Sequence, residues 1–274
     1  MTDQLAGTAR WTAAARAVES RRPDRLFDDP WAERLAGPDG FAALERHDRS
    51  DNPYVALRTW WLDNWCTRTA VGGCRQIVLL AAGLDTRAFR LVWPAGTVVF
   101  EVDRPELLSN KDRVLADAGA VPGCDRRPVG GDLLGDWSAA LRSAGFDPTA
   151  RTGWIAEGLL VYLAEPAARR LLRQTAELSR PARLAGDVVG MSLLTSPWMR
   201  SYLQGLAEAG VSWQYGTDEP ELLLTETGWQ PEQVVQPAEA APASRPWPYP
   251  APPRTADGFP RSHLFSATRP PLGT

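Results

Sequence analysis

Histidine is scarce in this 274-residue sequence, and the glycine-rich pattern that binds phosphate is incomplete. The two histidines, His47 and His263, leave few candidates for metal binding or for histidine-based acid–base chemistry. The cysteines, Cys66, Cys74 and Cys124, lack metal-ligand spacing. We therefore expect free thiols in a reducing cytoplasm and no metal site.

Long apolar runs and a surplus of basic residues are also missing. No run approaches the ~20 apolar residues that cross a bilayer, and the polar N-terminus has no signal-peptide pattern. The formal net charge of −3 disfavours nucleic acid as a partner. What remains is a globular chain, 44% hydrophobic, long enough for one large domain or two small ones.

From about residue 71 onward, short apolar runs alternate with amphipathic stretches. The runs that predict strands are 76–82, 97–103, 125–133, 153–163, 183–190, 231–237 and 263–269. Helical patterns separate the first five of them. This alternation predicts an α/β fold with a doubly wound, mostly parallel sheet of seven strands.

The first 70 residues have a helical pattern instead. Residues 8–20 are rich in alanine, Asp29 can cap a short helix that stops before Gly37, and a longer helix is expected over 53–70. We therefore divide the chain into an N-terminal helical cap (1–70) and a core (71–274). The core carries an inserted helical lid at about 190–217 and a proline-rich loop at about 238–260.

Ligands of doubly wound sheets bind beyond the carboxyl ends of the strands. The turn after the first predicted strand, AAGLDTR, contains one glycine, Gly83, whereas a dinucleotide fingerprint needs three in the pattern G-x-G-x-x-G. Asp85 would also point a negative charge at any phosphate bound there. The turn therefore disfavours NAD and FAD.

Carboxylates at the strand exits favour S-adenosylmethionine, which carries no phosphate. Asp103 can accept from both ribose hydroxyls, Asp132 from the adenine amino group, and Glu157 can face the methionine ammonium. Each of the two aspartates has an equally plausible structural role. Asp103 can cap the next helix, and Asp132 can be an ordinary turn residue. Glu157 lies in an apolar segment where a carboxylate is costly without a partner, which favours a functional role.

Several motifs together resemble one known family. QIVLLAAGLDTRAFRL, VVFEVDRPELLSNK, GDL and WIAEGLLVYL, in this order, are similar to those of the leucine carboxyl methyltransferase-like family. TARWTAAARAVESRRPDRLFDDPWAERLAG and GTDEP…LLLTETGWQ resemble its actinobacterial branch. The resemblance spans nearly the whole chain. It implies a Rossmann-like class I methyltransferase (EC 2.1.1.-) that uses S-adenosylmethionine.

The resemblance also implies where the cofactor binds. Residues 81–83 and Asp85 would line its methionine part, and Arg58 would bind its carboxylate. The family usually has glycine at the position of Ala81, so this residue bears on cofactor affinity. The expected cofactor-binding residues are Arg58, Ala81, Ala82, Gly83, Asp85, Asp103, Arg104, Asp132, Leu133, Glu157 and Gly158.

Few residues are available to activate an acceptor. A carboxylate acceptor is already ionised, whereas a hydroxyl gains about 10²–10⁴-fold from a base. Tyr162 and His47 are the candidate groups, and Arg16 can pair with an acceptor carboxylate. Each also has a plain structural alternative: packing for Tyr162, a solvated loop for His47 and a solvated helix face for Arg16.

The sequence contains 12 tryptophans, and six of them fall in the predicted helical cover: Trp11, Trp31, Trp60, Trp61, Trp198 and Trp213. As a group they favour a small aromatic or polyketide-like secondary metabolite as acceptor. We expect O-methylation, of a carboxyl group first. C- or N-methylation of a heterocycle such as indole remains an alternative, as does a catalytically degenerate protein that only binds cofactor. A homodimer also remains open.

Overall fold

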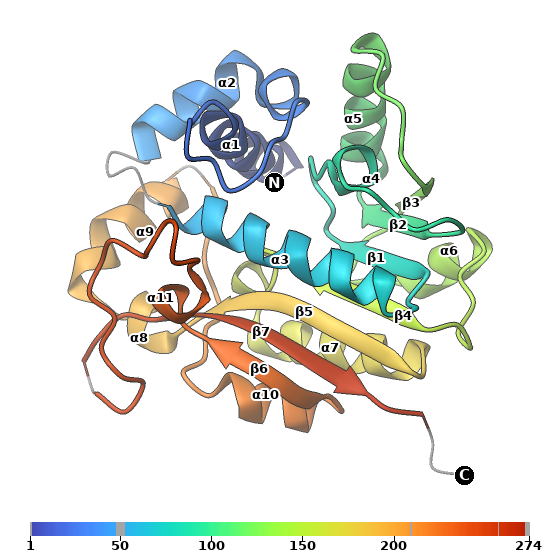
Figure 1. The fold of residues 1–274 in the computed structure, drawn as a ribbon. Coiled ribbons are helices and arrows are strands. Elements are labelled where there is room, and N and C mark those ends of the chain that lie inside the picture. The colour runs from blue at the N-terminus through green and yellow to red at the C-terminus, as the bar shows by residue number, and fades with distance from the viewer. Residues whose placement is uncertain (1, 48–52, 209, 257, 272–274) are drawn as a thin grey trace. The chain divides into compact units, whose positions relative to one another are not determined.

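The structure, a computed structural model, describes residues 2–47, 53–208, 210–256 and 258–271. Within these residues seven strands form a sheet in the order β3-β2-β1-β4-β5-β7-β6 (Figure 1). The pairs β1–β2, β2–β3 and β4–β5 are parallel, and β7 runs antiparallel to both β5 and β6. The predicted mostly parallel α/β sheet is confirmed. The chain divides into two compact units, 1–146 and 147–274.

The first unit begins with the helices that the sequence predicts. These are α1 (Thr2–Ser20), α2 (Ala32–His47) and α3 (Tyr54–Val71). Helix α2 is interrupted at Gly37, which has φ 57° and precedes Pro38, and α3 ends at Gly72. His47 is thus the last residue of α2 rather than a loop residue, and its side chain lies outside the described part of the structure.

Strands and helices then alternate through the rest of the first unit. They are β1 (Gln76–Leu80), α4 (Arg87–Arg90), β2 (Val98–Asp103), α5 (Pro105–Asp117), β3 (Asp125–Gly130) and α6 (Trp137–Ser143). All five residues of β1 are buried, as expected for a parallel strand covered on both faces.

The N-terminal helices share a hydrophobic core with the turn that follows β1. Helices α1 and α2 lie side by side (Figure 1). Ala13 and Ala14 of α1 and Leu35 of α2 pack with Leu84, which belongs to that turn. The helices expected as a separate cap therefore lie in the same unit as β1–β3 and contact the turn directly.

The second unit supplies the remaining elements. They are β4 (Thr152–Ala156), η1 (Leu160–Tyr162), α7 (Glu165–Leu178), β5 (Ala182–Val189), α8 (Met191–Leu194), η2 (Pro197–Met199), α9 (Arg200–Glu208), α10 (Pro220–Glu226), β6 (Gln230–Val235), α11 (Pro237–Ala240) and β7 (Ser262–Arg269). The short helices α8, η2 and α9 occupy the expected lid segment. In the described ranges, no helix is both long and apolar enough to cross a membrane.

The proline-rich segment expected to be extended begins with a short helix. Helix α11 forms because the side chains of Gln236 and Glu239 make reciprocal capping contacts with the backbone. Pro237 stands at the first helical turn, where a missing N–H costs nothing. The proline count therefore did not exclude a helix at this point.

The last strand, β7, lies between β5 and β6, so His263, its second residue, lies in an interior strand. His263 is fully buried, and neither ring nitrogen has a hydrogen-bond partner. Burial, together with the nearby Arg254 and Arg261, lowers the pKa of His263 to about 4 and outweighs the opposite effect of Asp218 and Glu221. The imidazole is therefore neutral at pH 7.

This buried histidine makes stability depend on pH in a definite direction. Unfolded chains bind a proton at His263 near its ordinary pKa of about 6.5, whereas the folded chain does so only near 4. The stabilising contribution is thus complete above about pH 6.5 and is lost as the pH falls towards 4, by about 3 kcal/mol. Urea unfolding at pH 7 and pH 4.5 should show a larger loss for the wild type than for His263→Phe. Equal losses would contradict this assignment.

Candidate cofactor site

Two left-handed residues and two backbone hydrogen bonds fix the shape of the turn after β1. Ala81 and Gly83 both lie in the left-handed region, with φ 50° and 53°. The N–H of Ala82 donates to the Val102 carbonyl at 3.1 Å, and the N–H of Asp85 donates to the Ala82 carbonyl at 2.9 Å. An added Cβ at Gly83 would meet no atom closer than 3.6 Å, so glycine is favoured there by conformation and not by lack of space.

Asp103, the last residue of β2, holds this turn. Its Oδ2 accepts the N–H of Gly83 at 2.7 Å, and its Oδ1 accepts the N–H of Arg104 at 2.7 Å. The two strand ends meet because β1 and β2 pair in parallel, with Leu80 opposite Val102. Arg104, not Asp103, occupies the N-cap position of α5. Each Asp103 oxygen retains a second lone pair, so the carboxylate can still accept from a ribose diol.

The exit of β3 joins the same edge of the sheet. The N–H of Gly131 donates to the Asp103 carbonyl at 2.9 Å. Asp132 is exposed, and its Oδ1 accepts the N–H of Leu134 at 2.9 Å, which makes a side-chain-stabilised turn. Leu133 is half-buried beside it. The predicted ribose and adenine residues are thus brought together, and their roles remain predictions.

Asp85 is engaged by its own turn. Its Oδ1 accepts the N–H of Arg87 at 2.6 Å, and its carboxylate also forms an ion pair with the Arg87 guanidinium. Burial would raise the pKa of Asp85, but Arg87, Lys111, Arg90 and Arg16 lower it to about 2. The carboxylate is therefore ionised with its charge balanced by Arg87, so it repels a phosphate less than the sequence alone predicts. Its place beside the methionine part remains a prediction.

The expected arginine of α3, Arg58, is half-buried and lies over the Tyr54 ring at 5.7 Å. Helix α3 instead reaches Arg87 and Arg90, at the end of the turn, through Asp63, a residue that the sequence analysis missed. Its Oδ1 accepts from Arg87 Nε and Arg90 Nη2, both at 2.7 Å, and its Oδ2 from Arg90 Nη1 at 2.6 Å. The available signal was a carboxylate within the apolar stretch WLDNW.

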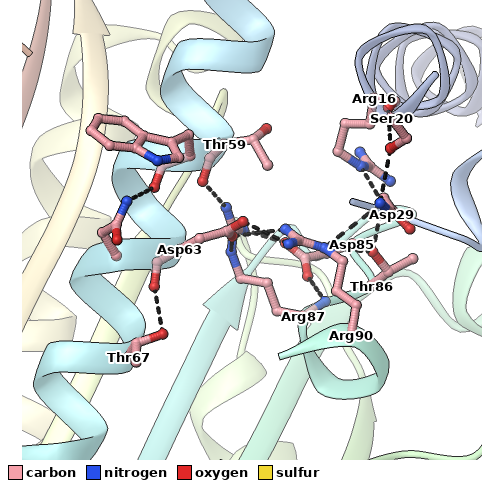
Figure 2. Close-up of polar contacts among 12 residues, drawn as sticks. Arg16, Ser20, Asp29, Thr59, Asp63, Thr67, Asp85, Thr86, Arg87 and Arg90 are labelled. Carbon is pink, nitrogen blue, oxygen red and sulfur yellow. Dashed lines mark hydrogen bonds and ion pairs between the residues drawn. The ribbon is translucent and has the colours of Figure 1, made fainter. Parts of the chain in front are cut away.

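Three carboxylates and three guanidinium groups form a cluster around the turn. We name this set the charge cluster: Asp29, Asp63, Asp85, Arg16, Arg87 and Arg90. Figure 2 shows Asp29 between Arg16 and Thr86, and Asp63 facing Arg87 and Arg90. The three negative and three positive charges balance, which is how a protein tolerates this many ions with little exposed surface.

Arg16 belongs to this cluster. Its Nε donates to Asp29 Oδ2 at 2.9 Å, and its Nη2 donates to the Leu84 carbonyl at 2.7 Å. Only 10% of its side chain is exposed. Arg16 therefore ties α1 to the turn after β1, and the expected contact with an acceptor carboxylate remains a prediction.

Three of the predicted residues belong to the second unit. Glu157 and Gly158 follow β4 directly and are half-buried. The N–H of Gly158 donates to Oδ1 of Asp187 in β5 at 2.6 Å, a partner that the sequence analysis missed although it is an acid in an apolar strand. Tyr162 is half-buried in η1, and its backbone carbonyl accepts from Gln214 Nε2 at 2.8 Å.

Comparison with known proteins gives a consistent picture. The family described as "Leucine carboxyl methyltransferase" matches residues 9–176. A protein of Frankia alni named "Putative S-adenosyl-L-methionine-dependent methyltransferase" is 44% identical over 266 residues, which are 92% of this chain and 91% of that one. A protein of Mycolicibacterium smegmatis with a similar name is 46% identical over 202 residues, 68% of each chain.

Two solved structures share the fold. A DUF574 family protein of Streptomyces avermitilis superposes with a TM-score of 0.65 at 18% identity and covers 96% of this chain and 97% of its own. A methyltransferase-like structure of Thermobifida fusca gives a TM-score of 0.60 at 17% identity, with 92% and 96% covered. At these identities the likeness concerns the fold alone.

Ala81 offers a direct test of the turn's conformation. A left-handed backbone costs an L-residue about 1–2 kcal/mol, and a glycine costs about 0.4–1 kcal/mol through the freedom of the unfolded chain. We therefore expect Ala81→Gly to keep or raise the free energy of unfolding. Ala82→Gly is the matched control: φ at Ala82 is not positive, and this change should lower stability by about 1 kcal/mol. Equal losses in urea unfolding would argue against the left-handed conformation of Ala81.

Proposed function

The chain belongs to the leucine carboxyl methyltransferase family and is an S-adenosylmethionine-dependent methyltransferase, and from this premise we propose that it methylates a carboxyl oxygen of a small aromatic metabolite. S-adenosylmethionine supplies an electrophilic methyl group on its sulfonium. The protein must then hold the cofactor, align the acceptor with that methyl group and exclude competing geometries. Such alignment can lower the activation barrier by on the order of 7–11 kcal/mol.

The observation that carries the placement of the cofactor is the bond between Asp103 and the N–H of Gly83. It brings an acceptor for a ribose diol next to a turn with a single glycine, and the set of groups suits a ligand with hydroxyls and no pyrophosphate. We propose that Asp103 accepts from the ribose and that residues 81–83 contact the methionine part. Arg58, Asp132 and Glu157 keep their expected roles in this proposal.

The scarcity of bases supports a carboxyl acceptor. A carboxylate is ionised at neutral pH and attacks without losing a proton. His263 is buried within the sheet and bound to no donor or acceptor, so it does not compensate for this scarcity. The name of the family, leucine carboxyl methyltransferase, also refers to a carboxyl acceptor. Tyr162 remains the proposed polar contact for the acceptor.

Tryptophan on α3 supports an aromatic acceptor. Trp61 is buried, whereas its neighbour Trp60 is half-buried, since adjacent positions on a helix face different directions. Trp198, in contrast, is 88% exposed and contributes no enclosed surface. The three cysteines are thiols and not disulfides, which fits the proposed cytoplasmic location, where a secondary metabolite would be modified.

The ribose role of Asp103 is tested with S-adenosylhomocysteine, the demethylated cofactor. Asp103→Asn removes the charge and one acceptor oxygen, so we expect Kd from calorimetry to rise at least about tenfold, the effect of losing one charged hydrogen bond. Asp117→Asn is the control, because Asp117, the last residue of α5, forms an exposed ion pair with Arg113. An unchanged Kd for Asp103→Asn would refute the role.

The acceptor atom is tested by the chemistry of the product. Methyl esters release methanol in alkali, whereas methyl groups on carbon, nitrogen or a phenolic oxygen stay bound. We expect methyl-labelled S-adenosylmethionine and a panel of aromatic acids, with their phenol and indole counterparts as controls, to give label that is volatile after alkali. Label retained in the product would instead identify hydroxyl, carbon or nitrogen methylation.

A further inference from the structure

We propose that Asp29 is a positioning residue for the cofactor turn, and that the segment between α1 and α2 thereby sets cofactor affinity. The inference rests on the proposed cofactor location at residues 81–83 and Asp103. Asp29 is 57 residues from Thr86 in the sequence, yet its carboxylate lies directly behind the turn. Its side chain has no exposed surface, so it acts on the turn and not on a ligand.

Asp29 holds the turn at two points. Its Oδ2 accepts the hydroxyl of Thr86 at 2.7 Å. The same oxygen accepts from Arg16 Nε at 2.9 Å, and Arg16 Nη2 in turn donates to the Leu84 carbonyl at 2.7 Å. The end of the turn is therefore bonded through both a side chain and a backbone carbonyl to groups of the N-terminal segment.

Asp29 is itself fixed. Its N–H donates to Ser20 Oγ at 2.8 Å, and that hydroxyl donates to the Arg16 carbonyl at 2.8 Å. Its Oδ1 accepts the N–H of Trp31 at 3.3 Å, a capping contact at the start of α2. Burial would raise the pKa of Asp29, but Arg16 and Arg90 outweigh it and lower the pKa, so the group is an anion.

Apolar contacts make the same connection. Leu84 packs in the core cluster with residues of α1 and α2. A Cβ built on Gly83 would lie 3.6 Å from Cβ of Ala9, so α1 runs beside the glycine whose N–H is bonded to Asp103. The N-terminal segment thus contacts the turn at Gly83, Leu84 and Thr86. Losing one anchor should shift the turn more than it unfolds the unit.

The test separates positioning from loss of stability. We expect Asp29→Asn, which keeps the shape and one acceptor oxygen but removes the charge, to raise KM for S-adenosylmethionine and Kd for S-adenosylhomocysteine on the order of tenfold, as misplaced binding groups do. A residue that only stabilised the fold would reduce the amount of active enzyme and leave KM for S-adenosylmethionine and Kd for S-adenosylhomocysteine at the wild-type level.

Thr86 provides an independent variant should Asp29→Asn not fold. Thr86→Val removes the hydroxyl and should weaken cofactor binding in the same direction, and Thr86→Ser should restore it. Asp39→Asn is the matched control, because Asp39 is a largely exposed carboxylate of α2 paired with Arg10. For Asp39→Asn, KM for S-adenosylmethionine and Kd for S-adenosylhomocysteine should equal those of the wild type.

The inference would be overturned if folded Asp29→Asn had the wild-type KM for S-adenosylmethionine and Kd for S-adenosylhomocysteine. It would also be overturned if Thr86→Val and Thr86→Ser had equal values of these constants. Failure of the proposed cofactor location looks different. In that case Asp103→Asn would also bind S-adenosylhomocysteine like the wild type, whereas failure of the positioning role alone leaves the Asp103 effect in place.

Discussion

The hydrogen bond from the Gly83 N–H to the Asp103 carboxylate is the contact on which the site depends. It links the exits of two parallel strands, and the Asp103 carbonyl extends the link to the third strand through Gly131. A carboxylate in this position both shapes the turn and offers further acceptor capacity. In the proposed cofactor site, the same residue thus shapes the turn and supplies a polar group for the ribose.

Behind this turn, the charge cluster replaces solvent as the environment of six ionised side chains. Buried ion pairs seldom add much net stability, because desolvation offsets their attraction. What a fully paired cluster does provide is one defined arrangement of the groups attached to it. Here those groups are the Leu84 carbonyl and the Thr86 hydroxyl, and Asp85 of the turn is itself a member, so the cluster determines where the turn lies.

Local patterns in the sequence predicted most of this fold. The alternation of short strand-like segments with helical patterns indicated each of the seven strands, and the helix expected over 53–70 is α3. The partners of the predicted residues were not accessible in this way. Asp29 meets Thr86 across 57 positions and Gly158 meets Asp187 across 29, and no periodicity encodes such a pairing. The interior place of β7 depends on strand order, which alternation alone leaves open.

The central claim is that the cofactor's ribose lies at Asp103 beside the turn after β1. A crystal structure of the complex with S-adenosylhomocysteine tests it most directly. The account predicts both ribose hydroxyls within about 3 Å of the Asp103 carboxylate oxygens, with the homocysteine part along residues 81–83. A complex whose ribose contacts neither Asp103 oxygen would contradict the account.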